Sequence, residues 1–278
     1  MLNNDFARRR VLVTGASSGI GLATSLELAR LGFQVIGAAR SDDGADVLRS
    51  EANRAGVSVS TTVFDLADES SYRQLIPSLD LWAVVNNASY PNAGAIEDVP
   101  LADVRIQLEA MVVAPAAVAL AALPSMRRRG SGRIVNVGSV AVGSGVPMLG
   151  WYLACKHALA GLTEVLRNEL SGSHIHVISV DPSTIDTPIW DRTHLDLQRR
   201  YRGSSQRASY ERAMWIIDSL RRWMRSPDTV AKAVGRALVS GKPRASYTVG
   251  FDGHLLAMGS RVVPRRMIDS ISRTVLDA

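Results

Sequence analysis

Tyr152 and Lys156 are the residues whose types and spacing best suit acid–base chemistry. Apolar residues at helical intervals follow Tyr152, so we predict a helix that carries both side chains on one face. A free tyrosine has a pKa of about 10, and a neighbouring ammonium group lowers it by favouring the phenolate. Such a tyrosine can exchange a proton with a carbonyl or alcohol oxygen. Ser139 could hydrogen-bond the same oxygen, and we predict these three residues to be catalytic.

The alternative is that the two side chains lie on the surface of a helix and have no chemical role, because tyrosine and lysine often occur at this spacing by chance. The chain's use of lysine favours a chemical role. Its basic residues are nearly all arginine, and Lys156 is the only lysine before Lys232. A compact ammonium, rather than a planar guanidinium, is therefore indicated at this position. The neighbouring Cys155 is interpreted as a buried filler.

A glycine-rich turn near the start of the chain predicts a dinucleotide site. The apolar run at residues 11–13 reads as a strand, an apolar helical pattern begins near Ile20, and a second strand follows at residues 33–39. Gly15 allows a sharp turn, Gly19 allows close approach of a pyrophosphate, and Gly21 allows the helix to pack near the sheet. The helix N-terminus supplies N–H groups and a positive dipole end.

Arg40 follows the second strand, where an acidic residue would bind a free ribose 2′-hydroxyl and a basic one would accept a 2′-phosphate. The acidic position falls on Ala39. The sequence therefore favours NADP(H), with NAD(H) possible. The alternative is an ordinary surface arginine that pairs with Asp42 or Asp43.

Further strands are predicted at 57–64, 81–85, 133–137 and 175–180, with helical segments at 67–79 and 101–129 between them. This alternation is typical of an α/β fold with parallel crossover connections. The candidate residues all follow the carboxyl ends of strands, where open α/β sheets bind ligands. Asn86 and Asn87 either cap a turn or brace the sheet.

Composition limits the remaining classes of function. The chain has 278 residues, 46% of them hydrophobic, which suits one packed α/β domain. We expect no membrane-spanning helix and no secretory signal, and the single cysteine fits a reducing cytoplasm. Residues 191–278 hold 17 basic and 8 acidic side chains, which either form a solvated face or attract anions. No nucleic-acid module and no metal site is predicted, because the histidines lack a ligand pattern.

With these motifs in order, residues 10 to about 190 resemble the short-chain dehydrogenase/reductase family, in the branch similar to 17β-hydroxysteroid and retinol dehydrogenases and to bacterial oxidoreductases. The resemblance implies a doubly wound, mostly parallel Rossmann-type sheet with helices on both faces. It implies one domain over 1–278, with a helical substrate lid at about 188–225 and a basic extension at about 250–278. The motifs that carry it are Thr14-Gly15-x-x-x-Gly19-x-Gly21, Asn86-Asn87-Ala88, Ser139, Tyr152-x-x-x-Lys156 and Pro182-x-x-x-x-Thr187.

The resemblance also implies roles. Tyr152 would exchange the proton, and Ser139 would orient the substrate oxygen. Lys156 would lower the pKa of Tyr152 and hold the nicotinamide ribose. The cofactor-binding set would comprise Gly15, Ser17, Ser18, Gly19, Ile20, Gly21, Arg40, Ser41, Asp65, Leu66, Asn87, Ala88, Ser89, Tyr152, Lys156, Pro182, Ser183, Ile185 and Thr187.

The expected activity is hydride transfer between a nicotinamide and the carbonyl or secondary alcohol of an apolar substrate, in a cytoplasmic homodimer or homotetramer. Tryptophans and methionines at 190, 214, 215, 223 and 224 either line a bulky pocket or pack the lid. Three residues depart from the family pattern: Met111 replaces an asparagine, and Ser89 and Ser183 each replace a glycine. They motivate the alternative of an NADP(H)-binding regulator with impaired chemistry.

Overall fold

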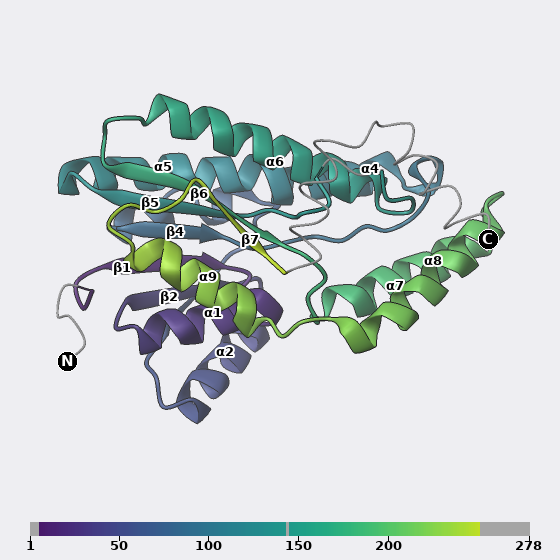
Figure 1. Ribbon diagram of the computed structural model, residues 1–278, viewed down its shortest axis with the longest axis horizontal. Helices are drawn as coiled ribbons and strands as arrows, with labels where there is room; N and C mark the ends of the chain where they lie inside the picture. The colour runs from purple at the N-terminus through teal and green to yellow at the C-terminus, as the bar shows by residue number, and fades with distance from the viewer. Residues whose placement is uncertain (1–5, 143–144, 251–278) are drawn as a thin grey trace.

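The computed structural model describes residues 6–142 and 145–250, which form one parallel sheet covered by helices on both faces (Figure 1). The strand order is β3-β2-β1-β4-β5-β6-β7, and every neighbouring pair is parallel. This confirms the doubly wound α/β class. The strands are β1 (Arg10–Thr14), β2 (Gln34–Ala39), β3 (Ser60–Val63), β4 (Ala83–Asn86), β5 (Gly132–Val137), β6 (Ile175–Pro182) and β7 (Ser246–Val249).

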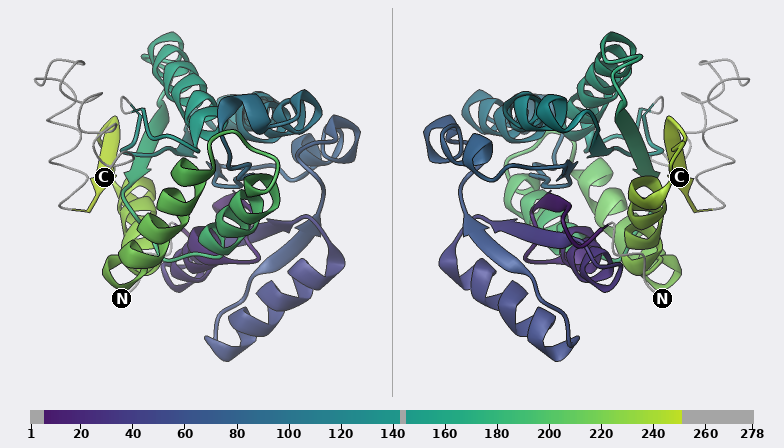
Figure 2. Two further views of the ribbon diagram at one scale, coloured as in Figure 1. Left: turned by 90° about the vertical axis from the view of Figure 1, so that its right-hand side faces the viewer. Right: turned by 90° about the vertical axis from the view of Figure 1, so that its left-hand side faces the viewer.

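Two apolar clusters hold the helices to the sheet. On one face, Leu28 of α1 (Gly19–Arg30) and Val234 of α9 (Asp228–Val239) pack on β1, β4 and β5, beside α2 (Asp42–Arg54) (Figure 1). On the other face, α5 (Ala114–Arg129) and the end of α6 (Gly150–Glu169) cover the same strands. Both faces of the central strands are buried, as a parallel sheet requires. Figure 2 shows the two helical layers edge-on.

Strand order reverses between β1 and β4, so the connections after these strands leave toward opposite faces. A crevice opens at the carboxyl ends of the strands at such a reversal, and it is the usual ligand site of this architecture. The glycine turn after β1 and Asn87 after β4 meet there. Ser139 follows β5, and Ser183 follows β6, at the same edge.

Two helical predictions need correction. Residues 67–79 form no continuous helix, only a 3₁₀ turn at Glu69–Ser71 and the short α3 (Leu75–Ser78). The segment 101–129 is interrupted: α4 (Leu101–Leu108) and α5 are joined by a π-helical turn, Glu109–Val113. Pro115 lies at the first turn of α5, where its missing N–H removes one of the donors needed to continue a regular α-helix.

The helical segment Leu101–Arg129 is long and apolar enough to cross a membrane by length and composition, although the sequence predicted no such segment. Half of its most apolar window is buried inside the protein. Ala114, Val118 and Met126 of α5 contribute that burial against the sheet. A core helix of an α/β protein has the same properties.

The lid segment contains α7 (Ile189–Tyr201), α8 (Arg207–Leu220) and a 3₁₀ turn, Arg221–Trp223, and it extends away from the sheet (Figure 1). Trp190 and Met214 pack in a third apolar cluster under the lid. Trp215 and Trp223 do not: their side chains are 57% and 77% exposed. These two tryptophans therefore neither line the pocket nor pack the lid. The predicted basic extension lies, beyond Gly250, outside the described residues.

Candidate active site

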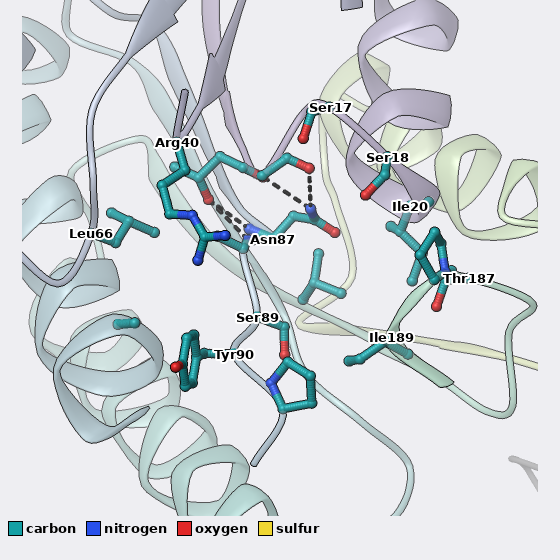
Figure 3. A pocket seen from close by; sticks show the side chains of 18 of the residues that line it. Ser17, Ser18, Ile20, Arg40, Leu66, Asn87, Ser89, Tyr90, Thr187 and Ile189 are labelled. Carbon is teal, nitrogen blue, oxygen red and sulfur yellow. Dashed lines mark hydrogen bonds between the residues drawn. The ribbon is translucent and has the colours of Figure 1, made fainter. Parts of the chain in front are cut away.

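A cavity of about 470 Å³ lies at the carboxyl edge of the sheet, along the crevice between β1 and β4. Figure 3 shows Arg40 and Leu66 at one end, Thr187 and Ile189 at the other, and Asn87 between them. Of the predicted residues, the structure brings into its wall Gly15, Ser17, Ser18, Gly19, Ile20, Arg40, Ser41, Asp65, Leu66, Asn87, Ala88, Ser89, Ser139, Tyr152, Lys156, Pro182, Ser183, Ile185 and Thr187.

Gly21 is the predicted cofactor residue that does not line the cavity. It lies behind the turn, where a Cβ atom would overlap the Gly15 carbonyl oxygen and approach the Asn87 amide nitrogen. Gly15 has a left-handed φ of 65°, and a Cβ there would come within 2.9 Å of the Ala88 Cα. The glycines therefore allow the turn and the β4 loop to pack in direct contact.

Replacing Gly21 by alanine is expected to weaken dinucleotide binding more than tenfold and to destabilise the protein by about 1–3 kcal/mol, because the backbone must shift to admit the methyl group. Cofactor titration and chemical denaturation measure the two effects. Gly161→Ala in α6 is the matched control, since no atom lies near its added Cβ. Wild-type cofactor affinity in Gly21→Ala would contradict the packing role.

Thr14 joins the turn to the loop after β4. Its Oγ1 accepts hydrogen bonds from the backbone N–H groups of Asn87 at 3.0 Å and Ala88 at 3.1 Å. The Asn87 side chain returns a bond to the Thr14 carbonyl at 2.9 Å (Figure 3). These bonds fix the two walls of the cavity to each other.

Asn86 braces the sheet, one of the two roles left open by the sequence. Its buried amide donates to the Pro115 carbonyl at 3.0 Å and to Asn136 Oδ1 at 2.8 Å. Asn136 in turn donates to Thr163 Oγ1 of α6 at 2.8 Å. This buried chain of hydrogen bonds links β4, β5 and α6, so it fixes the position of α6 relative to the two strands.

Tyr152 and Lys156 lie on the first turns of α6, as predicted, and both line the cavity. The Lys156 ammonium is buried, donates a 2.8 Å hydrogen bond to the Val137 carbonyl, and lies 5.7 Å from the Tyr152 ring centroid. Ser139 is part-buried in the same wall, and its Oγ accepts from the Ala141 N–H at 3.2 Å. The structure thus brings the three predicted catalytic residues together.

The prediction of a lowered tyrosine pKa does not hold for the protein alone. Burial raises the pKa of Tyr152 to about 12, while a hydrogen bond from Ser89 opposes that rise. The ammonium of Lys156 does not dominate because its hydrogen bond goes to a carbonyl rather than to the phenol. Burial also lowers the pKa of Lys156 to about 8, against the opposing charge of Asp181. At neutral pH the Tyr152 phenol is therefore protonated.

The cavity wall has several features that fit a dinucleotide. The helix N-terminus of α1 and the glycine turn form one side, while Arg40 and Asp65 stand where the adenosine end would lie. At the opposite end the Ser183 hydroxyl is buried without a hydrogen-bond partner among residues 6–142 and 145–250. An amide or hydroxyl group of a ligand would satisfy it. A dinucleotide would therefore be held by the residues already named.

Several lining residues were not predicted from the sequence. Tyr90 and Pro91 directly follow Ser89, so their proximity along the chain was an available signal. Gly44 lies in the first turn of α2, and Arg192 lies on α7; no local pattern marks either as a pocket residue. The full unpredicted set is Thr14, Ala38, Ala39, Gly44, Phe64, Tyr90, Pro91, Ala110, Val137, Gly138, Pro188, Ile189 and Arg192. Trp190, for which the sequence left pocket lining and lid packing open, also lines the cavity.

A parallel sheet with this strand order, a glycine turn after β1 and a cavity at its carboxyl edge defines the class of doubly wound dinucleotide-binding proteins. Residues 9–198 match the sequence profile of the family described as short chain dehydrogenase. The chain therefore belongs to the short-chain dehydrogenase/reductase family, and it is an NAD(P)-dependent oxidoreductase of that family.

Two relatives are similar over nearly the whole chain. The 3-amino-tetrahydro-pyrrolizinone reductase of Xenorhabdus hominickii is 32% identical over 278 residues, covering 94% of each chain. The NADPH-dependent 3-dehydrocapnine reductase of Ornithobacterium rhinotracheale is 27% identical over 274 residues, covering 95% of each. The crystal structure of an actinorhodin polyketide ketoreductase with NADPH superposes with a TM-score of 0.73 at 27% identity, covering 92% of this chain and 99% of that one.

Proposed function

We propose that this protein is an NADP(H)-dependent oxidoreductase that interconverts a carbonyl and a secondary alcohol on an apolar substrate. The observation that carries the proposal is the convergence of Ser139, Tyr152 and Lys156 on the cavity that also holds the glycine turn. A bound nicotinamide would supply or accept the hydride. The protein would supply the proton and fix the position of the reacting oxygen.

Each catalytic side chain then has a separate task. Tyr152 gives its proton to the carbonyl oxygen in reduction and takes one from the alcohol in oxidation. Ser139 donates a hydrogen bond to the same oxygen and so orients it. Lys156 places a positive charge beside the phenol, which favours the phenolate as the proton leaves. The raised pKa of Tyr152 keeps the phenol protonated at neutral pH, which supports reduction as the faster direction.

Apolar side chains in the cavity wall support an apolar ligand. Tyr90, Pro91, Ile189 and Trp190 line the cavity, and the Trp190 indole N–H is already bonded to the Ile185 carbonyl at 2.9 Å. The indole therefore presents apolar surface rather than a free donor. A screen of carbonyl compounds of graded size, with NADPH and NADH in parallel, tests the function. Tight NADPH binding without turnover of any compound would contradict it.

Preference for NADP(H) is supported by Arg40, which is exposed, lines the cavity and, in the described part of the chain, forms no ion pair with Asp42 or Asp43. Two relatives or neighbours named above use NADPH, according to their names. A guanidinium at this place would pair with the 2′-phosphate of the adenosine. NAD(H) lacks that phosphate and would bind more weakly.

Replacing Arg40 by alanine is expected to raise the Kd for NADPH by about 10- to 100-fold, because a charge-assisted hydrogen bond is lost. The Kd for NADH should change little. Fluorescence titration of both cofactors measures the difference. Arg54→Ala is the control, since Arg54 lies at the end of α2, the helix that follows Arg40, and pairs with Glu51 away from the cavity. Equal weakening of NADPH and NADH would argue against the assignment.

The domain organisation, cytoplasmic location and oligomeric state remain proposals. Exposed apolar side chains on α5 and α6, among them Leu120, Leu162 and Val165, suit pairing of these helices between subunits in a homodimer or homotetramer. The NADP(H)-binding regulator is the second candidate, because Met111 stands in place of the asparagine expected from the family. Raised activity on replacing Met111 by asparagine would support an impaired proton relay.

A further inference from the structure

A loop that lines the cavity lies between the domain and the lid. It comprises residues 90–95 after β4, called here the cavity loop, and its Tyr90 and Pro91 lie in the cavity wall. On the domain side, Gln107 of α4 donates to the Tyr90 carbonyl at 2.8 Å. The Gly94 N–H donates at 2.8 Å to a carbonyl in the segment before α6. The cavity loop therefore has a fixed position on the domain.

On the lid side, one arginine of α7 binds the same loop. Arg200 is only 15% exposed, and its two terminal nitrogens donate to the Ala93 carbonyl oxygen and to Asn92 Oδ1, each at 2.6 Å. The guanidinium also lies 3.3 Å from a carboxylate oxygen of Asp103 and 3.9 Å from one of Asp196. Because the fork of the guanidinium is rigid, these acceptors hold it in one position.

Two further lid side chains contact the cavity loop. Asp196 of α7 accepts a hydrogen bond from the Ala93 N–H at 3.4 Å. The hydroxyl of Tyr210, a fully buried residue of α8, accepts from the Ala95 N–H at 2.9 Å and donates to Asp98 at 2.7 Å. Tyr210 and the two loop alanines also belong to the apolar cluster under the lid. The cavity loop and the lid therefore pack as one unit.

This unit supplies two apolar parts of the cavity wall. Pro91 belongs to the loop, and Ile189 and Trp190 belong to the start of α7, the helix that carries Arg200 further along. A helix transmits the position of one end to the other, so the bonds of Arg200 fix how far these two parts stand apart. Their separation limits the size of a group that fits between them.

We propose that Arg200 is a positioning residue that determines which substrates the cavity accepts, because it holds α7 against the cavity loop. The inference rests on the proposed function. The substrates it selects are carbonyl or alcohol compounds whose apolar group fits between the loop and the start of α7. Ser139, Tyr152 and Lys156 lie after β5 and on α6, so Arg200 acts on substrate binding and leaves the proton transfer to them.

The cofactor end of the lid has its own attachment. A Cβ atom on Gly19 would lie 3.0 Å from Thr187 Cγ2, so the chain that enters α7 packs directly on the glycine turn. The two ends of the lid are joined by a bridge between Ile185 and Arg225. Loss of the Arg200 bonds would therefore release the far part of the lid, while its beginning stays beside the bound dinucleotide.

Replacing Arg200 by methionine is expected to raise KM by about tenfold for the compounds that the wild type prefers in a graded series of carbonyl compounds, because charge-assisted hydrogen bonds are lost. The kcat value and the Kd for NADPH should both stay within about threefold. Bulkier compounds should lose less, so the ratio of kcat/KM between the preferred and the largest compounds should fall about tenfold. Arg200→Lys keeps the charge and a donor and should retain most of the discrimination.

Arg199→Met is the matched control, because Arg199 is the neighbouring arginine of α7, is 76% exposed and lies outside the cavity wall. It should leave the ratio unchanged. Asn92→Ala removes one of the two acceptors and should lower the ratio less than Arg200→Met. The double variant should go no further than Arg200→Met alone. A merely structural arginine would instead lower the rates for all sizes of substrate by one common factor.

An unchanged ratio in an Arg200→Met protein that still binds NADPH overturns the inference. If this variant does not bind NADPH, Asn92→Ala takes its place, and an unchanged ratio there overturns it. If the wild type turns over no compound, the proposed function fails, and hydrogen exchange tests the attachment separately. The amides of the cavity loop should then exchange about tenfold faster in Arg200→Met than in wild type or Arg199→Met. Equal exchange in all three would overturn the attachment.

Discussion

Replacing Tyr152 by phenylalanine is expected to lower kcat/KM by about 10²- to 10⁴-fold in either direction. The phenyl ring keeps the shape of the side chain and removes only the group that exchanges the proton. The backbone turn of Gly15 and Gly19 is untouched by the change, so the Kd for NADPH should stay within about threefold of the wild-type value. Such a change in Kd is smaller than the change expected from losing one neutral hydrogen bond to the cofactor. Loss of turnover with retained cofactor binding is the specific signature of a missing acid–base group.

The measurement pairs steady-state kinetics with NADPH titration on the same protein samples. Tyr247→Phe is a matched control, because Tyr247 lies on β7 and its hydroxyl accepts a hydrogen bond from the Arg244 N–H at 3.2 Å, outside the cavity. Full turnover in Tyr152→Phe would remove Tyr152 from the reaction. Parallel loss of turnover and of NADPH binding would instead mean that Tyr152 serves the cofactor site.

The parts of this molecule that the sequence predicts well are those governed by short-range patterns. Gly15, Gly19 and Gly21 fall between an apolar strand and an apolar helix, so their roles follow from the immediate neighbours. Tyr152 and Lys156 share a helix face because of helical periodicity alone. Strands and helices alternate along the chain, so the sheet is parallel and all its strands end on the same side. The candidate residues that follow these strands are therefore expected at one edge of the sheet.

The parts that the sequence could not predict depend on distances between remote segments. Local spacing indicates that Lys156 is near Tyr152, but it does not reveal that the ammonium bonds to Val137 on β5. Nor does the spacing reveal how deeply the phenol is buried, and this burial raises the pKa of Tyr152 where a lowered pKa was expected. In the same way, the contact of Ser89 with Met111 joins residues from two layers of the fold. Departures from a family pattern are visible singly in a sequence, and their contact is visible only in the structure.

The lid illustrates a different limit. A tryptophan in a helix is ordinarily assigned to packing, and Trp190 packs against the apolar cluster of the lid while it also lines the cavity. Trp215 and Trp223 are exposed instead, and Trp215 lies under the Arg212 guanidinium at 4.6 Å. The two helices of the lid extend from the sheet, so each has a face that the domain does not cover (Figure 1). Helical periodicity predicts which residues share a face of a helix, but it does not predict which part of the protein packs against that face.

Replacing Lys156 by methionine is expected to abolish most activity, by about 10²-fold or more, while making the protein without cofactor more stable at neutral pH. The Lys156 side chain is only 4% exposed, and burial lowers its pKa from 10.5 to about 8. An unfolded lysine keeps its ordinary pKa. Between about pH 8 and pH 10.5 the unfolded state therefore binds more protons than the folded state, and stability of the wild type rises with pH in that window.

Below about pH 8 the folded protein carries the full cost of a buried ammonium, about 3 kcal/mol from the size of the shift. Methionine has a similar length and removes that cost, but it leaves the Val137 carbonyl without its donor, which costs about 1–3 kcal/mol. We expect Lys156→Met to gain about 1 kcal/mol near pH 7. The gain should vanish and then reverse as pH rises from about 8 toward 10.5, because the cost of the buried ammonium is relieved in that window while the cost of the unpaired Val137 carbonyl remains.

Chemical denaturation of both proteins near pH 7, 8.5 and 10 measures the difference in the free energy of unfolding. Burial raises the pKa values of Cys155 and Tyr152, so both groups reduce stability at alkaline pH, but they are present in both proteins and largely cancel. A difference that does not depend on pH would contradict the lowered lysine pKa. A less stable variant near pH 7 would show that the bond to Val137 outweighs the buried charge. The expected result, a stabler protein that has lost its activity, would mean that the fold retains Lys156 for chemistry against its own stability.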